Sequence, residues 1–121
     1  MKAEGGDFDR LLADGERPRV GGLEIKVMST PGHTPACVSY KIGAAVFVGD
    51  TLFAMGCGRL FEGSPEQMHH SLGRLAALPD DFKLYCAHEY TLSNARFAAH
   101  AFRENKAIAD RLRHVEQERS Q

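Results

Sequence analysis

Apolar and polar side chains alternate in two short stretches of the first half of the chain. Residues 23–28 alternate apolar and charged positions, and residues 37–42 repeat the alternation. A period of two is typical of a half-buried strand. Residues 44–48 follow Gly43 and are apolar without interruption, which predicts a hairpin whose second strand is covered on both faces. A further short strand is expected at 83–87.

The second half of the chain changes to helical periodicity. Ser64 is a good N-cap, Pro65 fits the first helical position, and Gln67 completes a capping box, so a helix is expected from here to near Pro79. Its apolar positions fall on one face: Met68, Leu72 and Leu75. Beyond Thr91 the pattern predicts one long helix, or two that are separated near residue 105. Strands followed by helices indicate an α/β layer arrangement.

Composition narrows the classes of function. The 121 residues are 43% hydrophobic and 26% charged, and the formal net charge is −1, so we expect one globular domain and no nucleic-acid partner. The polar N-terminus does not resemble a signal peptide, and no apolar run is long enough for a membrane span. The three cysteines form no Cys-x-x-Cys pair, which favours a reducing, cytoplasmic compartment over a disulfide framework.

Three side chains at strand ends are candidates for metal chemistry. Asp50 follows the apolar run 44–48, where a carboxylate is costly unless it is paired or bound to a cation. His33 and His88 each follow another predicted strand. Two histidines and one aspartate from distant parts of a chain can form a metal site. Each residue could also be structural: a turn cap for Asp50, and a surface or buried hydrogen-bonded imidazole for each histidine.

Other polar residues have plainer interpretations. His69 and His70 occupy adjacent helical positions, point about 100° apart and cannot clamp one ion, so we expect both at the surface. Arg59 lies in a glycine-rich stretch and could bind a carboxylate or form an ordinary surface salt bridge. Cys57 has no base nearby in the sequence, which argues against a role as nucleophile.

Several short motifs together carry a resemblance to a known family. They are Thr-Pro-Gly-His-Thr (30–34), Val-Gly-Asp-Thr-Leu-Phe (48–53), Gly-Cys-Gly-Arg-Leu-Phe-Glu-Gly (56–63), and Cys-Ala-His-Glu-Tyr-Thr (86–91), with Gln67, Met68, Ser71, Leu72 and Asn94. From about residue 20 to the end, the chain resembles glyoxalase II, or hydroxyacylglutathione hydrolase, of the metallo-β-lactamase superfamily.

The resemblance implies a fold and a cofactor. Members of this family form a four-layer αββα sandwich with a two-metal centre that is usually zinc and sometimes iron or manganese. For this chain we expect part of that sandwich, one sheet with flanking helices. The expected division is a lead-in segment at 1–18, the C-terminal half of the domain at 19–90, and a helical tail at 91–121.

The resemblance also implies roles for individual residues. His33 resembles a ligand of the first metal, Asp50 the carboxylate that bridges both metals, and His88 a ligand of the second metal. Arg59 and Tyr90 resemble residues that hold the glutathione moiety, and Phe61 stands where the family often has tyrosine. The implied reaction is hydrolysis of the thioester S-lactoylglutathione to lactate and glutathione.

The chain departs from the family pattern in its metal ligands. Four of the seven ligands come from a Thr-His-x-His-x-Asp-His motif, and no histidine precedes His33 here. We therefore expect weak or partial metal occupancy, impaired activity, and an uncovered apolar sheet face drawn from Val27, Val38, Ile42, Val46, Phe47 and Val48. Such a face would promote self-association or bind a complementary N-terminal half.

Two alternatives remain. Cys37 stands where glyoxalase II commonly has a second histidine, and this detail, with residues 8–40, resembles the persulfide dioxygenases. In those enzymes His33 and Asp50 would supply two of the three ligands of one iron. Residues 56–63 and the Glu89-Tyr90 pair fit glyoxalase II better. The other alternative is an α/β remnant without activity.

Overall fold

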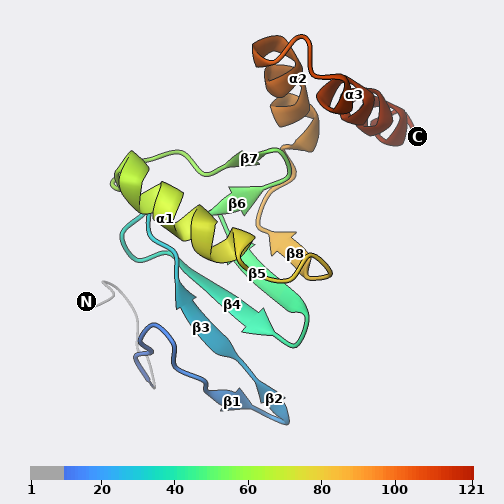
Figure 1. Ribbon diagram of the computed structural model, residues 1–121. Helices are drawn as coiled ribbons and strands as arrows, with labels where there is room; N and C mark the ends of the chain where they lie inside the picture. The colour runs from blue at the N-terminus through green and yellow to red at the C-terminus, as the bar shows by residue number, and fades with distance from the viewer. Residues whose placement is uncertain (1–9) are drawn as a thin grey trace.

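One four-stranded mixed sheet organises the molecule (Figure 1). The structure is a computed structural model that describes residues 10–121. The strands are β3 (Lys26–Ser29), β4 (Val38–Ile42), β5 (Ala45–Gly49) and β8 (Lys83–Cys86), and they lie side by side in that order. The pairs β3–β4 and β4–β5 are antiparallel, whereas β5 and β8 are parallel. The predicted α/β class and the predicted hairpin are confirmed.

The predicted strand at 23–28 is interrupted at Ile25. Residues Leu23–Glu24 form β2, which pairs with β1 (Arg19–Val20) in a small separate hairpin. Gly21 makes the turn with a φ of +59°, which a glycine adopts without steric cost. The Ile25 amide then donates to the Pro18 carbonyl oxygen, and the main sheet begins one residue later.

Helix α1 (Pro65–Ala76) begins as its capping residues predict. The Ser64 hydroxyl accepts from the Gln67 amide, and the Gln67 side chain accepts from the Ser64 amide. The helix buries Met68, Ser71 and Leu75 and lies across one face of the sheet (Figure 1). The resulting core joins α1 to the strands through Met28, Val46, Val48 and Leu75, with Leu52, Leu78 and Phe82 packed at its margin.

The opposite face of the sheet carries exposed aromatic side chains. Register places Tyr40, Phe47 and Tyr85 in one row across β4, β5 and β8, and they are 39%, 42% and 49% exposed. The expectation that β5 is covered on both faces is therefore wrong. Alternate residues of a strand point to opposite faces, and α1 covers only the face that holds Val46 and Val48.

The apolar set expected on one uncovered face is divided between the two faces. Val46 and Val48 are buried on the α1 side, whereas Phe47 is exposed on the other side. Val27 shares the row of Phe47 but is buried, and its backbone pairs with Gly15 and Glu16 of the lead-in segment. The uncovered row is consequently narrower than expected and mainly aromatic.

Strand β8 forms one edge of the sheet. All four of its residues are exposed. Its hydrogen bonds run toward β5: the Lys83 amide donates to the Ala44 carbonyl oxygen, and the Ala87 amide beyond the strand donates to that of Gly49. The other side of β8 has no partner strand among residues 10–121.

Two helices, rather than one long helix, follow from Thr91 to near the end of the sequence. They are α2 (Thr91–Ala101) and α3 (Lys106–Arg119), and the Asn105 side chain caps α3 by accepting from the Ile108 amide. They pack on each other, burying Ala95 and Val115, beyond the end of β8 and away from the body of the sheet (Figure 1).

The described part of the lead-in segment contains no helix before β1, and residues 1–9 of that segment lie outside the described residues. No described helix is long and apolar enough to cross a membrane.

Candidate metal centre and substrate pocket

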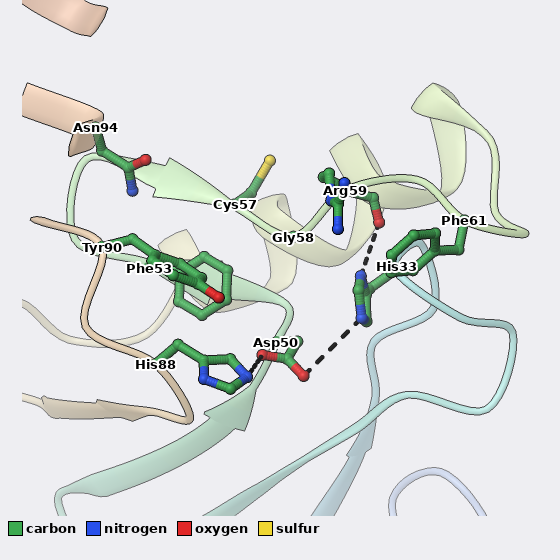
Figure 2. Close-up of a pocket in the computed structure, with 10 residues that line it drawn as sticks. All are labelled: His33, Asp50, Phe53, Cys57, Gly58, Arg59, Phe61, His88, Tyr90 and Asn94. Carbon is green, nitrogen blue, oxygen red and sulfur yellow. Dashed lines mark hydrogen bonds and ion pairs between the residues drawn. The ribbon is translucent and has the colours of Figure 1, made fainter. Parts of the chain in front are cut away.

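Three strand ends place His33, Asp50 and His88 around one pocket (Figure 2). Asp50 directly follows β5, His33 lies in the loop after β3, and His88 comes two residues after β8. Nε2 of His33 lies 3.9 Å from Oδ2 of Asp50, and Nε2 of His88 lies 3.2 Å from Oδ1. The two imidazoles thus approach different oxygens of one carboxylate.

Asp50 carries an unpartnered buried atom. Its Oδ1 is shielded from solvent and receives no hydrogen bond from the described residues, although the His88 ring lies close by. Buried carboxylate oxygens are normally satisfied by a donor or a cation, so an oxygen of this kind requires an explanation. A positively charged group between Asp50 and the imidazoles would supply one.

A backbone contact fixes the orientation of His33. Its Nδ1 lies 2.8 Å from the Arg59 carbonyl oxygen. A carbonyl can only accept, so Nδ1 carries the proton and donates, which leaves a lone pair on Nε2 in the neutral ring. Nε2 is the atom that faces Asp50. Metal-binding histidines are commonly oriented by such a second hydrogen bond.

The donor set is nevertheless incomplete. Among residues 10–121, no three His, Cys, Asp or Glu side chains meet in a group that could hold a metal ion by themselves. Because the imidazoles face opposite oxygens of Asp50, each candidate position has one histidine and one carboxylate oxygen. The assignment of His33, Asp50 and His88 as ligands stays a prediction.

The surrounding cavity of about 440 Å³ is partly apolar. Its remaining lining residues are Phe53, Cys57, Gly58, Arg59, Phe61, Tyr90 and Asn94 (Figure 2). Tyr90 stacks on the His88 ring at 5.4 Å between centroids and meets Phe53 edge-on at 5.1 Å. The aromatic rings support one wall of the pocket beside the candidate ligands.

Arg59 and Phe61 line the pocket beside His33. The Arg59 guanidinium lies 4.8 Å from the centre of the Phe61 ring, which in turn packs against the His33 ring at 4.9 Å. Arg59 forms no ion pair within residues 10–121, so the surface salt bridge considered from the sequence is not observed. His69 and His70 are exposed on α1, as predicted.

Two pocket residues have roles that sequence reasoning missed. Gly58 packs so closely that a Cβ atom there would collide with the Asp50 carbonyl oxygen. Asn94 of α2 donates from its side-chain amide to the Ala54 carbonyl oxygen at 3.0 Å, which ties the helix to the pocket rim. The glycine-rich stretch in the sequence indicates that another segment can approach this backbone closely. It does not indicate that the Asp50 carbonyl oxygen is the atom that does so.

Glu89 lies beside the pocket at the start of α2. Hydrogen bonds from the hydroxyl and the backbone amide of Thr91 hold the pKa of Glu89 below its ordinary value. The bond from the Thr91 amide is 2.8 Å long. A charged Glu89 therefore satisfies a free amide at the helix N-terminus.

Known proteins resemble this chain in sequence and in fold. The chain is 54% identical over 110 residues to hydroxyacylglutathione hydrolase from Aeromonas salmonicida (strain A449), covering 91% of this chain and 43% of that protein. ETHE1 from Myxococcus xanthus superposes with a TM-score of 0.63 at 41% identity, over 65% of this chain and 36% of that one. The di-iron-bound form of TTHA1623 gives a TM-score of 0.57 at 36% identity, over 66% and 40%.

The chain thus spans less than half the length of the curated relatives that it matches. The family model described as the metallo-beta-lactamase superfamily matches residues 2–88, which include the candidate ligands, the hairpin and α1. With the relatives and the superposed folds, this match shows that the chain belongs to the metallo-beta-lactamase superfamily.

Proposed function

We propose that this chain is one part of a metal-dependent thioester hydrolase of the hydroxyacylglutathione hydrolase type, acting on S-lactoylglutathione. The sequence relatives support this class of substrate. The observation that carries the proposal is the Asp50 carboxylate between two imidazoles, with a buried Oδ1 that accepts no hydrogen bond. A buried anionic oxygen without a hydrogen bond is a favourable position for a cation.

The residues present fit a metal, although they do not complete its site. His33 and His88 would each hold one ion, and Asp50, whose two oxygens face the two imidazoles, would contribute to both. A bound zinc, iron or manganese ion supplies Lewis acidity and lowers the pKa of a coordinated water. Catalytic zinc usually has three protein ligands, so two at each position should give weak, partial occupancy.

The pocket fits an organic anion next to the candidate ligands. The Arg59 guanidinium can bind a carboxylate of the glutathione moiety with two parallel hydrogen bonds. Tyr90 offers a hydroxyl and an aromatic face on the opposite wall, next to His88. Phe61 has no hydroxyl, so it contributes only apolar contact and holds the Arg59 side chain in place.

Metal binding is the direct test of the assignment. Elemental analysis and zinc titration should find weak, substoichiometric binding that a mild chelator removes. Asp50→Asn and His33→Ala should abolish it, whereas His69→Ala on α1 is a matched control that should bind as the parent chain does. Two tightly bound metals per chain would show that further ligands exist. No binding by the parent chain at any zinc concentration would refute the site.

Activity should be low in the isolated chain. Thioester hydrolysis is expected near the uncatalysed rate, because each metal position lacks ligands and Asp50→Asn then has little left to remove. Turnover of S-lactoylglutathione at ordinary enzyme rates, abolished by Asp50→Asn, would show that 121 residues suffice for catalysis.

The free state of Cys37, Cys57 and Cys86 is consistent with a cytoplasmic setting for this chemistry.

A partner is part of the proposal. The side chains of the aromatic row, Tyr40, Phe47 and Tyr85, are 39–49% exposed, and contiguous exposed apolar surface often marks a protein–protein contact. The relatives are more than twice as long as this chain. We propose that a complementary N-terminal half of the fold covers this row and supplies the missing ligands. Without it, the row leads to self-association.

Adding the N-terminal half of a relative in trans tests this partner. It should reduce binding of the dye ANS and raise zinc affinity, while Phe47→Ser should prevent the association. A monodisperse monomer without dye binding, unaffected by the added half, would contradict the proposal.

A further inference from the structure

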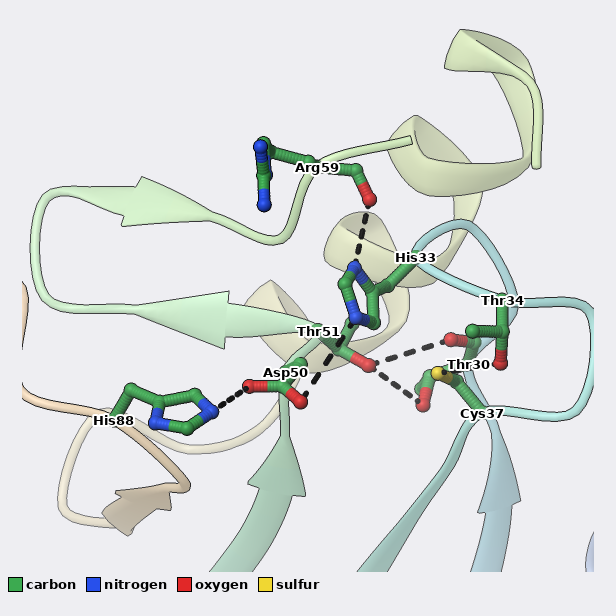
Figure 3. Close-up of polar contacts among 8 residues, drawn as sticks. All are labelled: Thr30, His33, Thr34, Cys37, Asp50, Thr51, Arg59 and His88. Atoms are coloured by element: carbon green, nitrogen blue, oxygen red, sulfur yellow. Dashed lines mark hydrogen bonds and ion pairs between the residues drawn. The ribbon is translucent and has the colours of Figure 1, made fainter. Parts of the chain in front are cut away.

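Three buried hydroxyl groups connect the segments that carry His33 and Asp50. The side chains of Thr30, Ser39 and Thr51 are fully shielded from solvent. The Thr30 and Ser39 oxygens lie 2.9 Å apart. The Thr51 hydroxyl lies 3.2 Å from Oγ1 and 3.4 Å from the carbonyl oxygen of Thr30 (Figure 3). The three groups therefore satisfy one another in the interior of the chain.

The three hydroxyl groups belong to segments that also carry the candidate ligands. Thr51 directly follows Asp50, and Thr30 precedes His33 by three residues at the end of β3. The bond from Thr51 to Thr30 thus joins the turn that carries Asp50 to the loop that carries His33. Ser39 on β4 anchors the Thr30 end to the sheet.

Residues 58–61 also contact both segments, because the Gly58 amide donates to the Thr51 carbonyl oxygen and the Phe61 amide donates to the His33 carbonyl oxygen. The His33 ring is held by the Arg59 carbonyl oxygen, and the Thr51 amide donates to Val48 within the turn after β5. The Thr51 hydroxyl adds a direct, buried side-chain hydrogen bond between the two segments (Figure 3). Removing it would leave a Thr30 carbonyl oxygen with one fewer donor in a dry environment, which favours rearrangement of the turn.

We infer that Thr51 is a positioning residue, which sets the placement of Asp50 relative to His33 through its hydrogen bonds to Thr30. It contacts neither metal nor substrate. The inference rests on the proposed metal site for its functional consequence, but the placement itself can be measured in the metal-free chain.

Thr51→Val tests the inference because valine has nearly the shape of threonine but no hydroxyl. In metal-free protein, proton–nitrogen spectra of the histidine rings should show displaced resonances for His33 and His88. In zinc titrations the affinity should fall about tenfold, as expected when a supporting contact behind a ligand is lost. Thr51→Ser keeps the hydroxyl and should restore both properties.

Thr34→Val is the matched control. Thr34 lies next to His33 and its hydroxyl contacts the Cys37 sulfur at 3.2 Å, so it belongs to the same loop without reaching the Asp50 turn. The histidine-ring spectra and the zinc affinity of Thr34→Val should equal those of the parent chain. Should Thr51→Val fail to fold, Thr30→Val removes the same bond from the other side and should displace the same resonances.

The outcomes separate this inference from the proposed function. Unchanged His33 and His88 resonances in Thr51→Val, or equal displacement by Thr34→Val, would overturn the positioning role. If the parent chain binds no zinc, the proposed function fails, and the ring spectra of the metal-free variants still decide the role of Thr51. If the role of Thr51 is purely structural, Thr51→Val should lower stability, and Thr51→Ser should not restore the histidine-ring resonances to their parent positions.

Discussion

The two faces of the sheet are built from the same strands but have opposite environments. On the α1 side, Val46 and Val48 are buried against Leu75. On the other side, Phe47 lies between them in sequence and stacks on Tyr85 at 4.9 Å with much of its ring exposed. The two faces differ because a helix covers only one of them, and not because the strand residues are apolar on one side alone.

This difference assigns different tasks to neighbouring residues. Burial behind α1 supplies the free energy that holds the strand ends, and so the pocket, in place. The aromatic row adds little to the stability of the isolated chain, because its side chains remain partly in water. Mutations on the two faces should therefore act on different measurements, stability on one and association on the other.

The largest expected effect is on the covered face. Leu75→Ala should lower the free energy of unfolding by about 2–4 kcal/mol, because it opens a cavity between α1 and the strands. Urea unfolding of Tyr85→Ala on the aromatic face is the matched measurement, since Tyr85 is 49% exposed and should cost about 1 kcal/mol at most. Equal losses in both variants would mean that the two environments do not differ as described.

A smaller effect should follow from loosening the start of α1. Ser64→Ala removes the side-chain acceptor for the Gln67 amide and should cost about 1 kcal/mol. Thermal unfolding would show it, and Ser64→Asp should recover most of the loss. An unchanged melting temperature would mean that α1 is held by packing alone.

On the aromatic face, stability should barely change while association does. Phe47→Ser loses one aromatic stacking contact, worth at most about 1 kcal/mol. Light scattering should nevertheless show less self-association than in the parent chain, with weaker ANS fluorescence. A large loss of stability without any change in association would show that this face is already covered.

The smallest effect concerns an exposed contact that ties α1 to the lead-in segment. Hydrogen bonds from the Ser29 amide and the Arg74 guanidinium lower the pKa of Asp14 from its ordinary value of 3.8. A lowered pKa stabilises the fold above the ordinary value, and the contribution disappears as the pH falls through the lowered pKa. Solvent screening keeps the effect small.

Unfolding as a function of pH would measure this contribution. Asp14→Asn should be slightly less stable than the parent chain near neutral pH, with the difference vanishing in strong acid. A difference that grows as the pH falls would contradict the assigned direction of the pKa.

The sequence could predict the elements whose signals are local. The capping residues around Ser64 define the start of α1, Asn105 separates α2 from α3, and Gly43 marks the β4–β5 turn. It could also single out His33 and Asp50 as candidates, because histidine and aspartate at strand ends are chemically informative. Their ligand role awaits the metal measurements.

The features that the sequence could not predict depend on contacts between distant segments. The exposure of Phe47 follows from which face α1 covers, and no local pattern encodes that choice. Thr51 and Thr30 are ordinary residues in sequence, and their bond exists only because two strand ends meet. Gly58 likewise gains its meaning from the Asp50 carbonyl oxygen beside it.

The edge position of β8 should produce alternating fast and slow exchange of its backbone amides with deuterium. In a strand, successive amides point to opposite sides, and the amides of Lys83 and Ala87 both face β5. Those of Leu84 and Cys86 face the open edge and should exchange orders of magnitude faster than their neighbours. Slowing of only these two amides would reveal a strand that adds to this edge, whereas slowing at Phe47 would locate contact on the aromatic row.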